Sequence, residues 1–272
     1  MLHAEFRSWI LLGIASLAFA QQMQMATAND WPSWRGPHRN GIALDETGLQ
    51  SEWPEYGPEV KWQIDGLGRG YSSIAISGGR IFTMGKRKAG CELIALDLNG
   101  GRELWATPVG GGDPNCTPTV DGGLVYALGR DGHLVAVDVT TGKIAWQKDF
   151  PKDFGGSMMS GWGYSESPLI DGDRLVCTPG AKDAVVVALN KKTGETIWKS
   201  AMPDDIGKRG KDGAGYSSIV ISHARDVKQY IQLTGRGVIS IDAENGKQLW
   251  SYNRIANGTA NISTPLVKGD SV

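Results

Sequence analysis

The sequence shows little charge imbalance and contains few cysteines. A formal net charge of -1 at pH 7 gives no electrostatic basis for binding nucleic acid or an acidic membrane surface. The three cysteines, Cys91, Cys116 and Cys177, include no adjacent pair and no CxxC, and their odd number excludes a complete disulfide framework. One pair remains an alternative, but the favoured interpretation is that all three are small buried apolar residues.

Common catalytic signatures are also missing. The chain contains no G-x-S-x-G, H-E-x-x-H or P-loop motif, and its four histidines are scattered. The glycine run Gly66–Gly70 does not match the dinucleotide-binding fingerprint. The residues alone therefore predict no catalytic group and no metal site.

Long apolar runs are limited to the N-terminus. Arg7 precedes the 12-residue stretch Trp9–Ala20, and Ala18-Phe19-Ala20 fits a small-x-small cleavage site. The stretch is short for a membrane span, and no later segment is long enough to be one. We predict a signal peptide over residues 1–20 and a secreted or periplasmic protein, with an uncleaved anchor as the alternative.

Glycine and tryptophan, in contrast, are abundant, with 38 and 10 residues. Four segments repeat the same pattern: Leu93–Trp105, Leu134–Trp146, Val186–Trp198 and Val238–Trp250. They align an acidic or amide residue (Asp97, Asp138, Asn190, Asp242), a glycine (Gly101, Gly142, Gly194, Gly246) and a tryptophan (Trp105, Trp146, Trp198, Trp250). Glycine suits the turn between two strands, and the acidic residue can accept backbone N–H groups there.

A second segment, strand–turn–strand in pattern, precedes each of these and starts again at Ser263. One unit is therefore four short strands, A to D, at a period of 41 to 52 residues, which predicts an all-β propeller of four-stranded antiparallel blades. We expect the propeller over 58–272 after an N-terminal segment over 21–57, with complete blades at about 72–107, 116–148, 166–200 and 217–252 and the start of another at 263. The unpaired ends predict a fragment of a seven- or eight-bladed ring.

The tryptophans end strand D near the outside of each blade, where they can dock one blade on the next. This role is predicted for Trp62, Trp105, Trp146, Trp198 and Trp250. Trp62 belongs to Pro58–Ile64, which has the pattern of an isolated strand D.

The repeat resembles the A-x-D-x-x-T-G-x-x-x-W motif of PQQ-type propellers, matched by Ala136, Asp138, Thr141, Gly142 and Trp146. That family includes quinoprotein dehydrogenases and the non-enzymatic outer-membrane assembly protein BamB. The opening Asp30–Gly41 is also similar to secreted bacterial members. The resemblance implies the fold, and it leaves both an enzyme and a scaffold open.

The loops that join strand D to the next strand A vary most in length, and variable loops on a rigid scaffold commonly bind ligands. In a propeller these D–A loops share one face with the B–C turns. Glu166 also breaks a column of small residues, so we expect it at the mouth of the central channel, where it could bind a metal, an amine or Arg69; a solvated loop end is the alternative. The candidate ligand residues are Arg69, Tyr71, Trp162, Tyr164, Glu166, Tyr216 and Asn261. Taken singly, each of them except Glu166 is better interpreted as framework.

We therefore predict a binding or protein-interaction scaffold of the cell envelope, with an envelope protein or a small-molecule or glycan ligand as its partner. The first alternative is a PQQ-dependent dehydrogenase that oxidises an alcohol or a polymer. The resemblance implies PQQ with Ca²⁺ for such an enzyme, but the chain has no Cys-Cys pair and no acidic Ca²⁺ motif. The second alternative is a carbohydrate-binding propeller.

Overall fold

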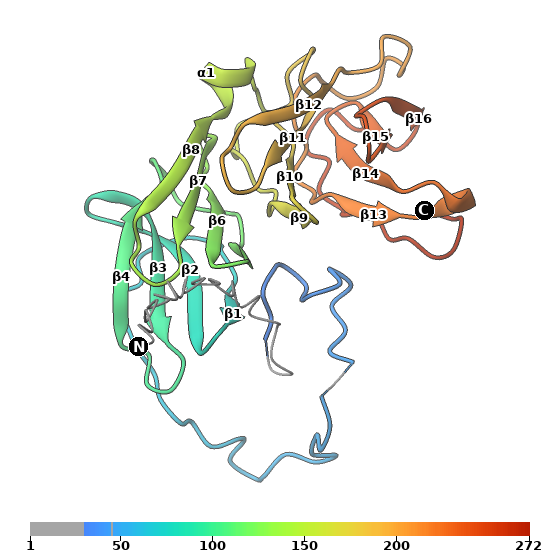
Figure 1. Cartoon of the computed structure of the whole chain (residues 1–272). Coiled ribbons are helices and arrows are strands. Elements are labelled where there is room, and N and C mark those ends of the chain that lie inside the picture. The colour runs from blue at the N-terminus through green and yellow to red at the C-terminus, as the bar shows by residue number, and fades with distance from the viewer. Residues whose placement is uncertain (1–29, 45) are drawn as a thin grey trace, which may run out of the picture.

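The computed structural model of the chain describes residues 30–44 and 46–272, so the predicted signal peptide lies outside the described residues. Four antiparallel sheets of four strands follow one another along the chain (Figure 1). In each sheet the strand order is the order in the sequence, so every connection within a blade is a hairpin. The prediction of an all-β propeller with four-stranded blades is confirmed.

Each of the four blades is built from four consecutive strands. Blade 1 contains β1 (Ala75–Ser77), β2 (Arg80–Arg87), β3 (Gly90–Asp97) and β4 (Glu103–Pro108). Blade 2 contains β5 (Thr119–Asp121), β6 (Leu124–Leu128), β7 (His133–Asp138) and β8 (Ile144–Asp149), followed by the short helix α1 (Phe150–Phe154). Blade 3 contains β9 (Leu169–Asp171), β10 (Arg174–Cys177), β11 (Val186–Asn190) and β12 (Thr196–Ser200). Blade 4 contains β13 (Val220–Ser222), β14 (Gln229–Thr234), β15 (Gly237–Asp242) and β16 (Gln248–Tyr252), with the 3₁₀ turn η1 (Ala224–Asp226) between its first two strands.

The turn between strands C and D has the same construction in every blade. In blade 2, Asp138 Oδ1 accepts hydrogen bonds from the backbone N–H groups of Thr140 (3.0 Å) and Thr141 (2.8 Å). These bonds also hold the pKa of Asp138 below its usual value. Gly142 then adopts a left-handed φ of 71°, which glycine reaches without steric cost. The acidic and glycine columns of the repeat thus encode this turn.

Four of the five tryptophans predicted to dock the blades lie against the turn glycine of the following blade. A Cβ atom added to Gly142 would lie 2.8 Å from the Trp105 ring, and one added to Gly194 would lie 2.7 Å from Trp146. Two of the indoles also donate across the boundary, since Trp105 Nε1 lies 3.2 Å from the carbonyl oxygen of Val139 and Trp146 Nε1 lies 2.9 Å from that of Lys191. Close packing of the indole ring on the turn glycine also joins the pairs Trp62–Gly101 and Trp198–Gly246. Glycine is therefore required in this column for two reasons: it adopts the left-handed conformation of the turn, and its missing side chain leaves room for the neighbouring indole.

A second set of contacts joins the blades near the axis and was not predicted. The Thr117 N–H donates to Ser167 Oγ at 3.0 Å, and the Ser167 N–H donates to Ser218 Oγ at 3.0 Å. The same bond, from a backbone N–H to the side-chain hydroxyl of the next strand-A segment, links five positions. We call them the hydroxyl belt: Ser73, Thr117, Ser167, Ser218 and Thr264. Like the tryptophans, every bond of the belt runs from one blade to the next.

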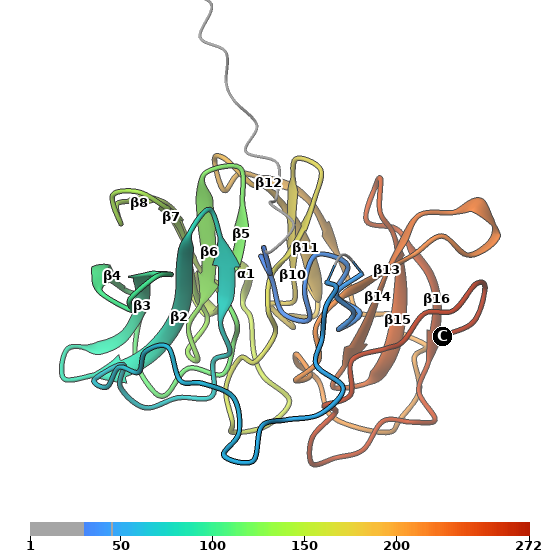
Figure 2. The same cartoon turned by 90° about the horizontal axis from the view of Figure 1, so that it is seen from below.

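Residues 31–41, the axial segment, lie inside the arc that the blades form (Figure 2). Trp31 pairs with Ile76 of β1, and the carbonyl oxygen of Pro32 accepts from the Val120 N–H of β5 at 2.7 Å. Farther on, Arg39 reaches blade 3. The axial segment therefore crosses the innermost strands of three blades in succession.

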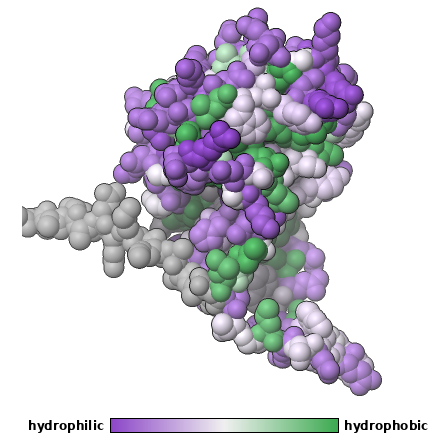
Figure 3. Space-filling model, turned by 90° about the vertical axis from the view of Figure 1, so that its right-hand side faces the viewer, coloured by the Kyte–Doolittle hydropathy of each residue, from purple (hydrophilic) through white to green (hydrophobic). Residues whose placement is uncertain are grey.

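The two outermost blade faces are covered to different extents. On blade 1, Trp62 and Ile64 pack against the small cluster around Ile94. On blade 4, Trp250 remains 38% exposed, and its Nε1 donates to Gln229 of the same blade. Figure 3 views the molecule from this side and shows apolar residues scattered among polar ones. Trp250 thus has no blade-docking contact of the kind that the other four tryptophans make within the described residues.

The three cysteines are fully buried and unpaired. No helix within residues 30–44 and 46–272 combines the length and hydropathy that crossing a membrane would require.

Candidate functional site

The D–A loops bring two of the predicted ligand residues together. The Trp162 and Tyr216 rings meet edge to face, with centroids 5.7 Å apart, and the Tyr216 hydroxyl lies 2.6 Å from Ser160 Oγ. Trp162 is 53% exposed, while Tyr216 is half-buried. Loops that precede blade 3 and blade 4 therefore present one aromatic pair to solvent.

Beside this pair, a pocket of about 400 Å³ opens near the axis. Tyr216 forms part of its wall, and the axial segment contributes an aromatic and a cationic side chain. The residues that characterise this axial pocket are Trp34, Arg35, Asn115, Ser167, Tyr216 and Thr264. Hydroxyl, amide and guanidinium groups line the pocket together with the apolar side chains of Ile262 and Leu266, so it suits a ligand with both polar and apolar parts.

Two further candidates, Arg69 and Tyr71, lie in the loop before blade 1. Arg69 forms an exposed ion pair with Asp113 at 3.4 Å, and Tyr71 is exposed and held through its backbone N–H, which donates to the carbonyl oxygen of Pro114. Neither side chain lines the axial pocket. The structure therefore does not gather the seven predicted residues around one cavity.

Tyr164 and Asn261 are buried parts of the framework. The Tyr164 hydroxyl donates to the carbonyl oxygen of Pro179 at 2.9 Å, and its ring packs edge to face on Phe150. Asn261 Nδ2 donates to the carbonyl oxygens of Thr234 (2.9 Å) and Gly235 (3.0 Å). Both side chains thus hold loops in place through hydrogen bonds that are already complete.

Glu166 is not at an open channel mouth, as its column position predicted, and it does not pair with Arg69. It is 2% exposed, and its carboxylate accepts hydrogen bonds from the Thr178 N–H (2.7 Å) and Thr178 Oγ1 (3.0 Å). Burial raises the pKa of Glu166 to about 8, although the Thr178 bonds and the charge of Arg39 act in the opposite direction. Glu166 is thus a buried carboxyl of blade 3.

Arg39 is the basic residue near Glu166, and sequence reasoning missed it. Its guanidinium is buried and donates to the carbonyl oxygens of Ser167 (2.9 Å) and Pro168 (3.0 Å). Burial also lowers the pKa of Arg39 to about 10. A single arginine thus fastens the axial segment to blade 3.

The described residues do not fit the PQQ and Ca²⁺ that the resemblance implies. No three His, Cys, Asp or Glu side chains converge within residues 30–44 and 46–272 in a way that could hold a metal ion. The buried carboxylate of Glu166 is engaged by Thr178, and the charge of Arg39 acts on it. We therefore derive no chemical step through this cofactor.

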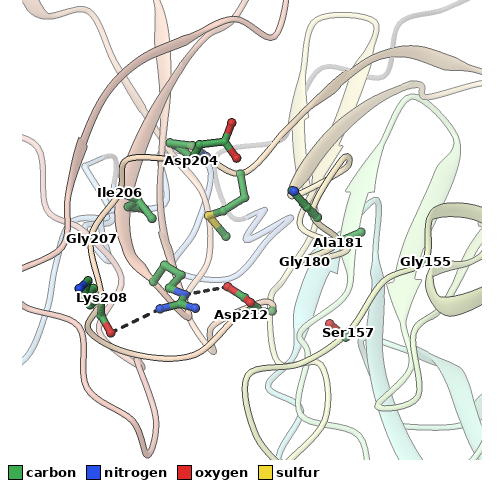
Figure 4. A pocket seen from close by; sticks show the side chains of 14 residues that line it. Gly155, Ser157, Gly180, Ala181, Asp204, Ile206, Gly207, Lys208 and Asp212 are labelled. Carbon is green, nitrogen blue, oxygen red and sulfur yellow. Dashed lines mark hydrogen bonds and ion pairs between the residues drawn. The ribbon is translucent and has the colours of Figure 1, made fainter.

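A second pocket, of about 470 Å³, lies away from the axis, between blades 3 and 4 (Figure 4). Its walls come from the B–C turn of blade 3, from the D–A loop that precedes blade 4, and from Arg236 in the B–C turn of blade 4. We call it the loop pocket; the residues that characterise it are Lys182, Met202, Ile206, Lys208, Asp212 and Arg236. Both pockets thus open among the connections that the sequence marked as variable.

Comparison with known proteins places this architecture in a family. A family model described as outer membrane protein assembly factor BamB matches residues 51–153 and 91–272. The BamB of Nitrosomonas eutropha is 25% identical over 138 residues, which are 51% of this chain and 28% of that protein. The dehydrogenase subunit of the quinone alcohol dehydrogenase of Acetobacter aceti is 28% identical over 182 residues, which are 60% of this chain and 21% of that protein.

Among solved structures, the quinohemoprotein alcohol dehydrogenase of Comamonas testosteroni superposes with a TM-score of 0.58 at 16% identity, over 85% of this chain and 42% of that chain. This likeness concerns the fold alone. The chain spans about a quarter of the length of the two curated relatives named above. Because the family model covers nearly all of the repeats, the chain belongs to the PQQ-like repeat family of the outer membrane protein assembly factor BamB.

Proposed function

We propose that this chain is part of a non-catalytic binding scaffold of the cell envelope, which docks a protein partner on its D–A loop face. The observation that carries the proposal is the difference between the two faces. The D–A face holds an exposed aromatic pair and two pockets, whereas the C–D turns on the opposite face are short and alike. The BamB relatives support the scaffold role by their name.

Site-specific photo-crosslinking in the natural host tests this proposal. A photoreactive residue replaces Trp162 on the D–A face, and a matched variant carries it at Lys192, which is exposed in a C–D turn of blade 3. We expect a discrete adduct with an envelope protein from position 162 only, and the protein in the envelope fraction. Equal labelling from both positions, or a protein found only in the cytoplasm, would overturn the proposal.

The second candidate is a PQQ-dependent dehydrogenase, which the Acetobacter relative favours. Its test adds PQQ and Ca²⁺ to the purified protein, followed by absorbance of bound quinone and dye-linked oxidation of alcohols. Because the described residues do not fit this cofactor, we expect neither signal. Saturable quinone binding with turnover would replace the scaffold proposal by the enzyme.

A further inference from the structure

The loop pocket combines an apolar wall with several cations. Ile206 and Pro203 are buried in the wall, and Met202 is half-buried beside them. The Met202 N–H donates to the carbonyl oxygen of Lys182 at 2.7 Å, which fixes the B–C turn of blade 3 against this wall. The pocket volume of about 470 Å³ lies within the range of small-ligand sites.

Three basic side chains from three separate connections line the pocket: Lys182, Lys208 and Arg236. Lys182 and Lys208 are exposed on different connections, and Arg236 is 26% exposed. Asp204 and Asp212 are the acidic residues of the lining, so basic residues outnumber acidic ones by three to two. Such an arrangement favours an anionic group in contact with an apolar body.

Arg236 already forms an ion pair with a carboxylate of the D–A loop, that of Asp212. Its Nε donates to Asp212 Oδ1 at 2.7 Å, and its Nη1 donates to the carbonyl oxygen of Lys208 at 3.4 Å. Figure 4 shows both contacts as dashed lines to one guanidinium. A guanidinium has five N–H donors, so these two bonds leave others for a second oxygen ligand. Asp212 is 78% exposed, and solvent therefore competes for this pair.

An arginine in the corresponding turn of blade 2 serves as the comparison. Arg130 Nη2 donates to the carbonyl oxygen of Gly161 at 3.1 Å, and its side chain packs closely on Gly163. It therefore holds a neighbouring loop by a backbone contact. Arg236 differs, because its main partner is an exposed carboxylate at the edge of a pocket.

We propose that the loop pocket binds a carboxylate carried on a compact apolar body, and that Asp212 is an internal competitor for Arg236. The ligand carboxylate engages Arg236 with Lys182 and Lys208, while the apolar body lies against Met202 and Ile206. Two sources offer this chemistry: the C-terminal carboxylate of a peptide and a free organic acid. The inference rests on the proposed binding function, since it names the chemistry that one site on the D–A face recognises.

Calorimetric titration of the whole protein with N-acetyl-leucine and its uncharged amide tests the inference. We expect the carboxylate to bind at least tenfold more tightly than the amide, because only it pairs with the basic side chains. Arg236→Gln should weaken carboxylate binding at least tenfold, whereas Asp212→Asn should tighten it several-fold by removing the competitor. Lys211→Gln, on the same loop and outside the pocket, removes an equal charge and should leave the affinity within twofold.

Asp212→Asn distinguishes the proposed competition for Arg236 from a purely structural role of the Asp212–Arg236 ion pair. If Asp212 only anchors the loop, the variant loses affinity, and the inference is overturned. Equal binding of acid and amide, or an equal effect of Lys211→Gln and Arg236→Gln, would overturn it as well. If Arg236→Gln does not fold by circular dichroism, Lys182→Gln replaces it with the same expected direction, since Lys182 is exposed.

A tetrapeptide with a free C-terminal leucine distinguishes the two sources. Tighter binding of the tetrapeptide than of N-acetyl-leucine supports a peptide terminus, and equal binding supports a free acid. The proposed function fails independently, because cross-linking from position 162 can be lost while the loop pocket still binds carboxylate.

Discussion

The contact between a strand-D tryptophan and the next turn glycine gives a sharp test of what holds the blades together. Gly194 has a φ of 73°, and a Cβ at this position would lie 2.7 Å from Trp146. Gly194→Ala therefore adds two costs. The left-handed conformation costs an L-residue about 1–2 kcal/mol, and overpacking against a fixed ring adds about 1–3 kcal/mol. We expect Gly194→Ala to lower the free energy of unfolding by roughly 2–5 kcal/mol in urea titrations.

The matched control is Gly172→Ala, in the A–B turn of the same blade. Gly172 also has a left-handed φ, 58°, but nothing lies within 4 Å of its added Cβ. It should therefore show only the conformational cost, about 1–2 kcal/mol. In a double variant, Trp146→Leu should recover part of the excess loss at Gly194, because the smaller side chain relieves the overlap. Equal destabilisation by the two alanine substitutions would refute the reasoning.

Three further outcomes are expected. Because burial raises the pKa of Glu166 from 4.5 to about 8, the native state holds this proton more tightly than the unfolded chain. The free energy of unfolding should then fall as the pH rises across this window, by up to about 1.4 kcal/mol per pH unit. Glu166→Gln should abolish this loss, and urea titrations at pH 5 and pH 8 measure it; an unchanged pH dependence argues against the buried carboxyl. Arg39→Met should release the axial segment and speed its limited proteolysis more than tenfold, whereas Arg35→Met, which loses only a bond to its own segment, should not. Ser167→Ala should lower the free energy of unfolding by about 1–2 kcal/mol, because the buried N–H of Thr117 loses its acceptor. Ser73→Ala, at the exposed first position of the hydroxyl belt, should leave this free energy unchanged, and thermal melts of both variants measure the difference.

The blades could be predicted because the repeat encodes local structure. The acidic residue, the glycine and the tryptophan lie within nine residues, so one alignment of the chain with itself reveals the turn around Gly142 and the strand that ends at Trp146. The sequence did not predict the hydroxyl belt because it contains both serine and threonine and its bonds join residues about 50 positions apart. Column-by-column comparison of the strand-A segments for hydroxyl side chains would have found it.

The site could be predicted only in part. Loop-length variation singled out the D–A loops, and the Trp162–Tyr216 pair and both pockets lie among them. The environment of Glu166 could not be deduced, because its column position does not show that Thr178 and Arg39 surround it. Arg39 contacts residues 128 and 129 positions away, and no local pattern marks a contact of that range.

The tryptophan–glycine contacts and the bonds of the hydroxyl belt all run from one blade to the next along the chain, and this has a consequence for how such chains change in length. Blades 2 and 3 each give an indole and an N–H to the following blade and receive the same two groups from the preceding blade. An interior repeat can therefore be duplicated or excised while these two kinds of contact are kept at the new junction. Removing blade 2, for example, would bring Trp105 to Gly194 and the Ser73 N–H to the hydroxyl of Ser167, which keeps a tryptophan–glycine contact and a bond from an N–H to a hydroxyl. These two kinds of contact thus require a glycine and a hydroxyl side chain in the next blade, but not one particular blade. Gene duplication can therefore lengthen the array while both kinds of contact are kept.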